Sequence, residues 1–341
     1  MNPREEPLLF QKYPLNVPWL PLVDSPTPIT QLENLGAAVG HPSLWMKRDE
    51  KAGTIFGGNK VRKLEFLLGE ALQRKASKIV TFGAYGSNHA LATTLYAKHF
   101  GFQVDLFLSP PNEHPDPQCL KNLLFASSLG ANVRLTSYPY RFLREIIGIG
   151  MSKWRGLASQ ARAVYFIPTG GASTIGCLGF VNAALELEKQ VAANVMPKPA
   201  LIVLPVGSGG TWAGLQAGLA LTQLQSQVIG VNVASVASRR SVQRLMKQTL
   251  ALLSKAPNCE RVRGVADARD VVMSYRGDGY AVPTIEGRRA KRLLWETERI
   301  VIEDTYTAKA MAAFLDLART GRFDCRPLLF WNTCNGVNIS R

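Results

Sequence analysis

Short apolar runs alternate with helix-length segments along most of this 341-residue chain, and this alternation constrains the fold more than any other feature. The runs typical of strands are 78–82, 104–108, 133–135, 164–167, 201–206, 228–233 and 328–331. Helical spacing is predicted over 64–72, 87–100, 117–129, 141–159, 177–190, from 207 to about 224, 286–299 and 307–320. Strands that alternate with helices pair as parallel sheets covered on both faces. We therefore predict an α/β fold.

Composition agrees with a globular protein, since 46% of the residues are hydrophobic and 19% are charged. The first 45 residues are rich in proline and leucine and predict an extended arm over a core. We expect a cytoplasmic protein, because no apolar run approaches the roughly 20 residues that cross a bilayer and no signal-like start is seen. Five cysteines without CxxC spacing predict reduced thiols, and the four histidines form no metal-ligand pattern, so we expect no metal.

The formal net charge of +15 raises the possibility of nucleic-acid binding, because basic patches neutralise phosphates. The basic residues are spread along the chain, however. The densest groups, Arg239-Arg240 and the cluster at 288–292, are not interleaved with aromatic residues. We therefore expect a basic surface that attracts small anions, and no nucleic-acid partner.

Lys60 follows Gly57-Gly58-Asn59, a turn with little side-chain bulk that a flat ligand could approach closely. A lysine amine becomes a nucleophile when it loses its proton, which desolvation or neighbouring cations such as Arg62 and Lys63 promote. The segment is compatible with a Schiff-base lysine or with an ordinary turn before a basic helix. Taken alone it favours the ordinary turn, because most lysines are solvated charges.

Three loops follow predicted strands and precede predicted helices. Gly207-Ser208-Gly209-Gly210-Thr211 favours a phosphate cradle over a mere tight turn, because glycines and free helix-start amides suit an anion. In Ser87-Asn88-His89, Ser87 is a candidate N-cap, and the same amides could receive a carboxylate while Asn88 bonds a ring oxygen. The loop at 168–173 is equally compatible with a structural turn and with a site wall.

Tyr280 and Tyr306 each lie just before a predicted helix. A phenol can stack on a ligand, bind a substrate or move a proton. For an isolated tyrosine, packing remains the favoured interpretation.

Five segments occur in one order between about Pro28 and Val337: Lys47-Arg48-Asp49-Glu50, the Gly-Gly-Asn-Lys-x-Arg-Lys-Leu-Glu-Phe run at 57–66, Ser87-Asn88-His89, the loop at 207–211, and Tyr-Thr-x-Lys-Ala at 306–310. Together they resemble the pyridoxal-phosphate (PLP) enzymes of the D-cysteine desulfhydrase and 1-aminocyclopropane-1-carboxylate (ACC) deaminase family, which are tryptophan-synthase-β-like enzymes of fold type II. The resemblance implies two domains, each an open, mostly parallel twisted sheet flanked by helices, with PLP in the cleft between them. Residues 1–63 and 168–341 would form the large PLP-binding domain, and 64–167 an inserted small domain.

The resemblance also implies residue roles. Lys60 would hold the cofactor as a Schiff base and move the substrate α-proton, with Ser87, Tyr280 and Tyr306 as its catalytic partners. Thr333 would lie near the pyridine nitrogen, where a neutral hydroxyl suits elimination chemistry. The cofactor-binding set is Lys60, Asn59, Asn88, Gly207, Ser208, Gly209, Gly210, Thr211 and Thr333. The substrate-binding set is Ser87, Asn88, His89, Tyr280, Tyr306 and Thr307.

Thr307 bears on the substrate, because family members that open the cyclopropane ring look to have Glu at this position, whereas the desulfhydrases carry Thr. The resemblance therefore favours β-elimination from D-cysteine or a related D-amino acid to pyruvate, ammonia and sulfide. The alternatives are ACC ring opening to 2-oxobutanoate and ammonia, or a non-catalytic PLP-binding homologue. The resemblance further implies a homodimer.

The chain departs from the family pattern beside the predicted pocket. Gly86 replaces a usual Gln, Leu91 an Arg and Ala281 a Gly, and Asn332-Thr333-Cys334-Asn335 replaces His-Thr-Gly-Gly. We infer either an altered substrate or a weakened enzyme that keeps its cofactor. Cys334 could be a nucleophile, but a small buried thiol is the favoured interpretation.

Overall fold

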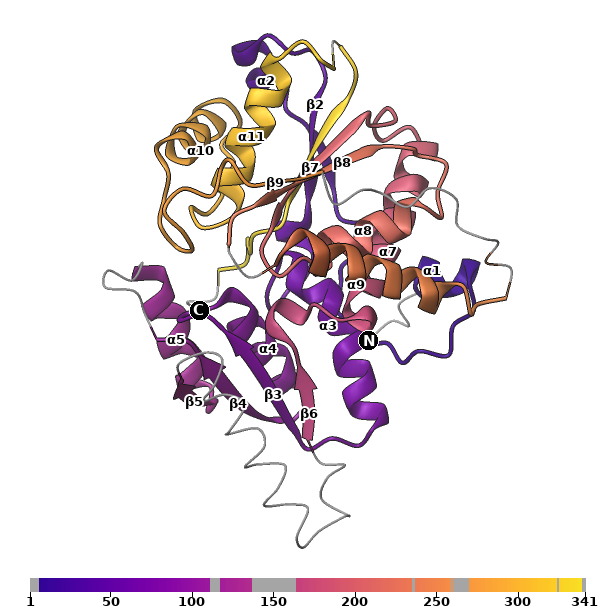
Figure 1. Ribbon diagram of the computed structural model, residues 1–341, viewed down its shortest axis with the longest axis vertical. Coiled ribbons are helices and arrows are strands. Elements are labelled where there is room, and N and C mark those ends of the chain that lie inside the picture. Colours follow the sequence, from indigo (N-terminus) through magenta and orange to yellow (C-terminus); the bar gives the residue numbers. More distant parts are fainter. Residues whose placement is uncertain are drawn as a thin grey trace, which may run out of the picture. The chain divides into compact units, whose positions relative to one another are not determined.

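The chain folds into two compact units in a computed structural model (Figure 1), which describes residues 6–110, 117–136, 164–234, 237–257, 259, 270–323 and 325–338. The first unit comprises Met1–Asn16, Pro21–Lys63 and Ala172–Arg341. The second comprises Val17–Leu20 and Leu64–Gly171. Each unit has its own sheet, and each is described by itself below.

The first unit contains a six-stranded sheet in the order β1-β2-β10-β7-β8-β9. Its strands are β1 (Ile29–Gln31), β2 (Leu44–Arg48), β7 (Leu201–Val206), β8 (Gln227–Asn232), β9 (Val271–Val272) and β10 (Leu328–Asn332). All neighbours pair in parallel except the edge pair β1 and β2, which is antiparallel. Every residue of β7 and β10 is buried, as expected for central strands covered on both faces.

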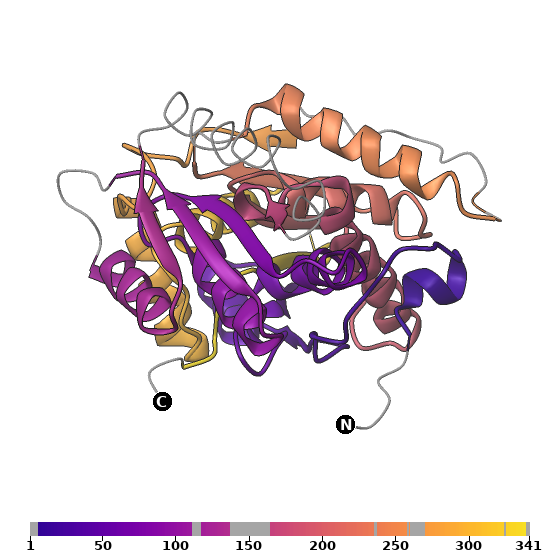
Figure 2. The ribbon, with the colours of Figure 1, turned by 90° about the horizontal axis from the view of Figure 1, so that it is seen from below.

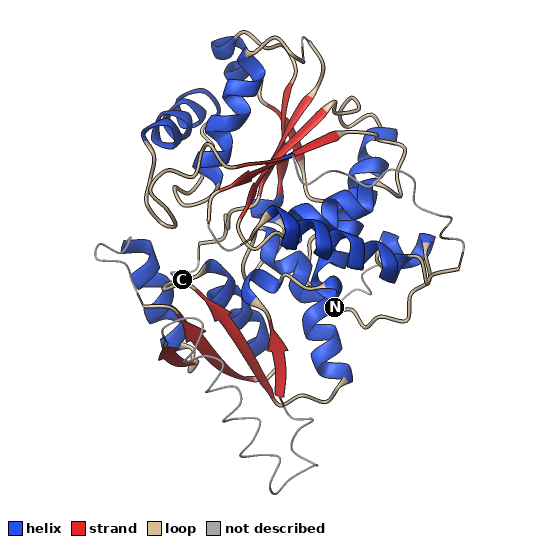
Figure 3. Ribbon diagram, viewed as in Figure 1, coloured by secondary structure: helices blue, strands red, loops and turns tan. Residues whose placement is uncertain are grey.

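Helices flank both faces of this sheet (Figures 1 and 3). Helices α2, α10 and α11 pack together, and α11 contacts β7, β8 and β10. Helix α8 contacts β7 and β8 and packs against α7 and α9, while α1 contacts α7. The helices are α1 (Leu8–Lys12), α2 (Glu33–Val39), α7 (Thr174–Ala192), α8 (Gly210–Leu219), α9 (Arg239–Leu253), α10 (Ile285–Glu298) and α11 (Thr307–Arg319), with a short 3-10 turn η1 (Asp49–Lys51) after β2.

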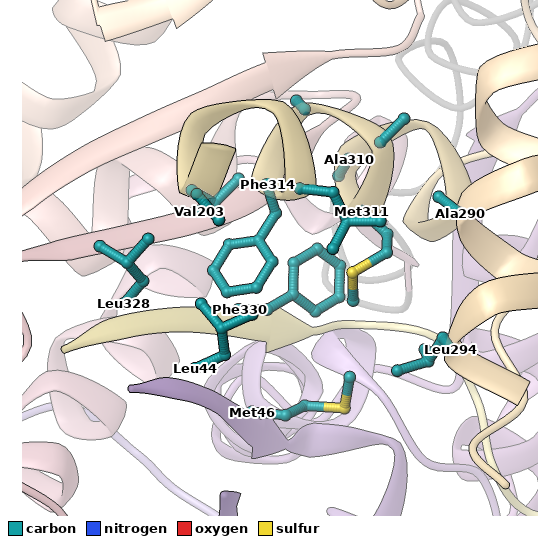
Figure 4. Packing of buried hydrophobic residues seen from close by; sticks show 14 of the residues in the cluster. Leu44, Met46, Val203, Ala290, Leu294, Ala310, Met311, Phe314, Leu328 and Phe330 are labelled. Atoms are coloured by element: carbon teal, nitrogen blue, oxygen red, sulfur yellow. The ribbon is translucent and has the colours of Figure 1, made fainter. Parts of the chain in front are cut away.

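One apolar layer fixes α11 on the sheet (Figure 4). Phe314 of α11 and Phe330 of β10 are fully buried, with ring centroids 5.6 Å apart. Burying a Phe side chain contributes about 1.5–3 kcal/mol, so this layer holds the helix firmly. The residues labelled around the two rings are Leu44, Met46, Val203, Ala290, Leu294, Ala310, Met311 and Leu328. The start of α11, which follows Tyr306, is therefore held by the core.

The second unit contains a four-stranded, all-parallel sheet in the order β5-β4-β3-β6. Its elements are β3 (Lys78–Gly83), α4 (Asn88–His99), β4 (Gln103–Leu108), α5 (Pro117–Ser128), β5 (Asn132–Leu135), β6 (Val164–Ile167) and the 3-10 turn η3 (Thr169–Gly171). Helix α3 (Asn59–Gln73) begins in the first unit and continues into the second. Figure 2 shows the purple and magenta strands of this sheet side by side.

The predicted α/β class with mostly parallel sheets is confirmed. The first 45 residues, however, are not an extended arm, because they include α1, β1 and α2. The helix after β7 ends at Leu219 rather than near 224, and α9 was not predicted at all. Its buried side chains recur at helical spacing, but polar residues outnumber apolar ones around them. The helix expected over 141–159 lies outside the described residues.

None of the helices in the part of the chain that the structure describes is long and apolar enough to cross a membrane. Within the same ranges, no group of three or more His, Cys, Asp or Glu side chains could hold a metal ion.

Candidate active site

Lys60 is the second residue of α3, directly behind a glycine turn. Gly58 has φ of 81°, and a Cβ there would lie 2.6 Å from the Thr333 carbonyl oxygen. The Asn59 amide donates to that same oxygen at 3.2 Å. Only a residue without a side chain fits this close approach. The turn thus places Thr333, the residue directly after β10, beside the start of the helix that carries Lys60.

The Lys60 amine is electrostatically prepared to be a nucleophile. Desolvation by the surrounding protein, and secondly the positive charge of Lys63, lower its pKa to about 7, while Glu303 opposes the shift. The amine donates to Asn59 Oδ1 at 2.9 Å. Near neutral pH a large fraction of Lys60 is therefore unprotonated, as a lysine nucleophile requires.

The glycine loop (residues 207–211) joins β7 to α8. Gly209 has φ of 88°, and a Cβ on Gly207 would lie 2.8 Å from Tyr306 Cε1, so the Tyr306 ring lies against the loop. Thr211 Oγ1 accepts a hydrogen bond from Asn59 Nδ2 at 2.9 Å, which links the loop to the residue before Lys60. The unsatisfied amides and dipole at the start of a helix favour an anion here.

Lys63, which the sequence identified only as a cation near Lys60, also lies beside the glycine loop, and that position was not predicted. Its side chain is buried, and its Nζ lies 3.1 Å from the position that a Cβ on Gly210 would occupy. Burial lowers its pKa to about 8. A buried amine beside a glycine loop provides positive charge for an anion. The sequence did contain a signal for this position: Lys63 lies three residues after Lys60, so both side chains lie on one face of the helix.

Glu303 organises the start of α11. Its carboxylate accepts hydrogen bonds from the backbone amides of Thr305 at 2.8 Å, Tyr306 at 3.0 Å and Thr307 at 2.6 Å. The Thr307 hydroxyl, fully buried, donates to the same carboxylate at 2.9 Å. Burial raises the pKa of Glu303, and these hydrogen bonds oppose that shift. The Thr307 hydroxyl is therefore already hydrogen-bonded to Glu303. Direct contact of Thr307 with a substrate stays a prediction.

Tyr280 and Tyr306 form an edge-to-face pair with ring centroids 5.7 Å apart. Both side chains are half-buried, so the pair packs together while keeping some exposed surface. This geometry satisfies the packing interpretation of both tyrosines. Tyr280 therefore packs on the Tyr306 ring, which in turn lies against the glycine loop.

A buried ionic network supports the first turn of α3. The Arg62 guanidinium pairs with Asp49 at 2.7 Å and with Glu186 at 3.0 Å, and Lys47 pairs with Glu186 at 2.5 Å. Burial alone would raise the pKa of Glu186, but Arg62 and Lys47 hold it well below its usual range. Removing one partner of such a set leaves an uncompensated buried charge. The Lys47-Arg48-Asp49-Glu50 segment therefore helps to hold the helix that carries Lys60.

The Ser87-Asn88-His89 segment belongs to the second unit. Ser87 is the N-cap of α4, accepting from the amides of His89 at 3.2 Å and Ala90 at 3.4 Å. Buried His89 bonds Thr81 Oγ1 through Nε2 at 3.0 Å. Because the Thr81 hydroxyl donates to the Ile167 carbonyl, His89 Nε2 carries the hydrogen of their shared bond. The substrate contacts of Ser87, Asn88 and His89 stay predictions.

The loop at 168–173 contains η3 and ends at Ser173, the N-cap of α7. A Cβ on Gly210 would lie 3.0 Å from Ala172 Cα. The end of this loop therefore packs against the glycine loop, which favours the site-wall interpretation.

The comparisons with known proteins agree with these features. A family model described as pyridoxal-phosphate dependent enzyme matches residues 20–333. The chain belongs to this family. A protein of Pyrococcus furiosus provisionally named an ACC deaminase is 34% identical, over 98% of this chain and 95% of that one. A D-cysteine desulfhydrase of Klebsiella pneumoniae is 33% identical, over 93% of each chain.

Solved structures of related proteins also resemble this chain. The structure of an ACC deaminase homologue superposes on this chain with a TM-score of 0.80 at 32% identity, covering 96% of this chain and 95% of that one. A threonine deaminase from T.th., at 21% identity and a TM-score of 0.60, covers 92% and 94% and shares the fold. The chain is thus a PLP-dependent enzyme of the ACC deaminase and D-cysteine desulfhydrase family.

The residues of the first unit fit this cofactor. The glycine loop, which side chains at 207 or 210 would fill, combines helix-start amides with the buried Lys63 amine, as a phosphate requires. Lys60 supplies an amine with a pKa near 7 for a covalent bond to an aldehyde. The family's cofactor, PLP, carries both of these groups.

Three departures from the family pattern have visible structural settings. Gly86 has φ of 64°, and a Cβ there would lie 2.2 Å from Cys119 Cα, so a larger residue cannot occupy this backbone. Ala281 adopts the left-handed conformation with φ of 60°, which ordinarily favours glycine. Leu91 is buried in α4, where an arginine would need a charge partner.

The departures after β10 also form specific contacts. The Cys334 thiol donates to Asn332 Oδ1 at 3.2 Å, and burial raises the pKa of this thiol far above its usual range. A buried protonated thiol is a poor nucleophile, which agrees with the structural interpretation of Cys334. Asn335 Oδ1 accepts from the Gly57 amide at 2.7 Å and so ties this loop to the turn before Lys60.

Proposed function

We propose that the protein is a PLP-dependent lyase that eliminates the β-substituent of a small D-amino acid, with D-cysteine as the foremost candidate. The observation that carries the proposal is the setting of Thr307. This side chain is fully buried and donates to the Glu303 carboxylate at 2.9 Å. A glutamate at 307 would place a second carboxylate against Glu303, and like charges at that distance disfavour each other. The surroundings of residue 307 therefore support threonine over glutamate, and the family resemblance links threonine at this position to the desulfhydrases.

Cofactor binding would use residues of the first unit. Lys60 would bind the aldehyde carbon, and the glycine loop with Lys63 would bind the phosphate. Thr211 already accepts from Asn59, so its own hydrogen can be donated to a phosphate oxygen. When bound, PLP withdraws electrons from the substrate α-carbon and makes its hydrogen acidic.

The protein's side chains would then control where protons go. Lys60 Nζ, with a pKa near 7, is suited both to accept a proton and to return it at neutral pH. Tyr306 lies against the glycine loop and Tyr280 packs on its ring, so the two phenols would orient the substrate over Lys60. Ser87 would bind the substrate carboxylate at the start of α4, and Thr333 would face the ring nitrogen.

The decisive experiment is an incubation of the purified protein with D-cysteine, L-cysteine and ACC, followed by measurement of pyruvate, sulfide and 2-oxobutanoate. We expect pyruvate and sulfide in equal amounts from D-cysteine and neither product with Lys60→Ala. Release of 2-oxobutanoate from ACC as the main activity would overturn the proposal in favour of ring opening. A yellow protein that turns over none of these three compounds would overturn the proposal in favour of a non-catalytic homologue.

A further inference from the structure

Asn122, on α5, makes buried contacts to the loop that carries Asn88. Its Nδ2 donates to Asn88 Oδ1 at 2.8 Å and to the Gly86 carbonyl oxygen at 2.9 Å. Its own Oδ1 accepts from Gln118 Nε2 at 3.0 Å. The side chain is 4% exposed, whereas its neighbours Gln118 and Lys121 are exposed. Both donor hydrogens of the Asn122 amide are therefore used on the segment 86–88.

These contacts decide which way the Asn88 amide points. An asparagine side chain offers a carbonyl oxygen on one side and an NH2 group on the other. Because Asn88 Oδ1 is taken by Asn122, the Nδ2 group faces the other way, with two hydrogens to donate. A donor suits an anionic oxygen, whereas a carbonyl oxygen in the same place would repel it.

The contacts depend on the absence of a side chain at residue 86. A Cβ on Gly86 would lie 2.2 Å from both Cα and O of Cys119, so any other residue would push α5 away. With glycine there, the α5 backbone lies directly on the loop and Asn122 reaches it. The departure at 86 and the contact of Asn122 are thus two parts of one arrangement.

We propose that Asn122 is a positioning residue that holds the Asn88 amide with its NH2 group directed at the ring oxygen of the cofactor. This inference rests on the proposed function, since it takes Asn88 as a ligand of that oxygen. In this role Asn122 would act through its hydrogen bond to Asn88 rather than through contact with the cofactor or the substrate.

A double-mutant cycle tests this role. Asn122→Asp keeps the shape but replaces the NH2 donor by an acceptor, so Asn88 would turn its own NH2 towards α5. We expect the affinity of the full-length protein for PLP to fall about 10- to 100-fold, which corresponds to the loss of one hydrogen bond to a charged group. Visible absorbance of the bound cofactor measures this affinity. In an Asn88→Ala background the same change should cost no more than about twofold, because coupled residues are not additive.

The matched control is Lys121→Gln, which makes the same change of one charge unit at the exposed neighbour on α5. We expect it to leave cofactor affinity unchanged. The pH midpoint of the bound cofactor's visible absorbance should move in Asn122→Asp and stay in place in Lys121→Gln. If Asn122→Asp does not fold, Asn122→Ala enters the same cycle with the same expected coupling.

An equal loss of affinity in both backgrounds, with an unmoved pH midpoint, would show a purely structural tie and overturn the inference. A wild-type protein that stays colourless with added PLP would instead overturn the proposed function itself. The two failures are therefore distinguishable.

Discussion

Two regions of this molecule differ in how many residues of the family pattern they keep. The cofactor cluster (Asn59, Lys60, Lys63 and the glycine loop) keeps each expected residue, and buried contacts join its parts. The predicted substrate loops (residues 84–91 and 277–283) carry Gly86, Leu91 and Ala281 in place of the residues usual in the family pattern. The charged residues and glycines expected to hold the cofactor are thus kept, whereas most departures fall on residues predicted to lie near the substrate; the segment 332–335, beside Thr333, is the exception.

The largest effect is expected from removing the nucleophile of the cofactor cluster. Lys60→Ala should abolish the yellow colour and the activity, because no other amine among the described residues has both a pKa near 7 and a position beside Asn59. Visible absorbance after dialysis measures the loss. Lys75→Ala, at an exposed lysine, should keep both colour and activity. Colour retained in Lys60→Ala would move the covalent site elsewhere.

The support beneath the cofactor cluster should be the next most sensitive. Glu186→Gln leaves Arg62 and Lys47 short of their shared buried carboxylate, and breaking such a set costs about 3–5 kcal/mol. Urea denaturation measures the free energy of unfolding. Glu188→Gln is the matched control, since its partly exposed pair with Lys12 contributes at most about 1 kcal/mol. Equal effects would mean that the network does not support the helix.

A smaller effect concerns pH. Lys60 attaches an aldehyde only when unprotonated, so the rate of attachment should rise with pH around a midpoint near 7. Lys63→Met removes the neighbouring positive charge, which favours protonated Lys60 and raises its pKa, so the midpoint should move to higher pH.

Pyridoxal is the probe for this measurement, because it lacks the phosphate that Lys63 is proposed to bind. Lys75→Met provides the control with an unchanged midpoint. A midpoint that moves to lower pH in Lys63→Met would contradict the electrostatic account of the cofactor cluster.

The smallest effect is expected in the substrate loops. Ala281 has φ of 60°, a conformation that costs a residue with a side chain about 1–2 kcal/mol. Ala281→Gly removes this strain but loses about 0.5–1 kcal/mol through the freedom of glycine in the unfolded chain, so a net gain of up to about 1.5 kcal/mol should remain.

Thermal unfolding compares this variant with Ala193→Gly, whose parent residue has an ordinary φ of −83°. The control should lose stability. If both variants lose stability equally, Ala281 is not strained.

Local sequence signals predicted much of the fold. Period and length identified the central strands β7 and β10 and the helices α10 and α11 within one or two residues, because burial on both faces or one face leaves a clear pattern. Helix α9 was missed because its buried stripe is narrow and polar residues surround it. The glycine loop was recognised because a strand, glycines and a helix start are contiguous in sequence.

The sequence by itself determined the α/β class, the family and the residue types that can hold PLP, since these depend on contiguous patterns and on motifs in a fixed order. Only the tertiary structure decided that Lys63 is buried beside Gly210, that Glu303 engages Thr307, and that Asn122 holds Asn88. Contacts such as that between residues 63 and 210 bridge long stretches of chain. They set the electrostatics of each site, because burial and charge neighbours exist only once the chain has folded.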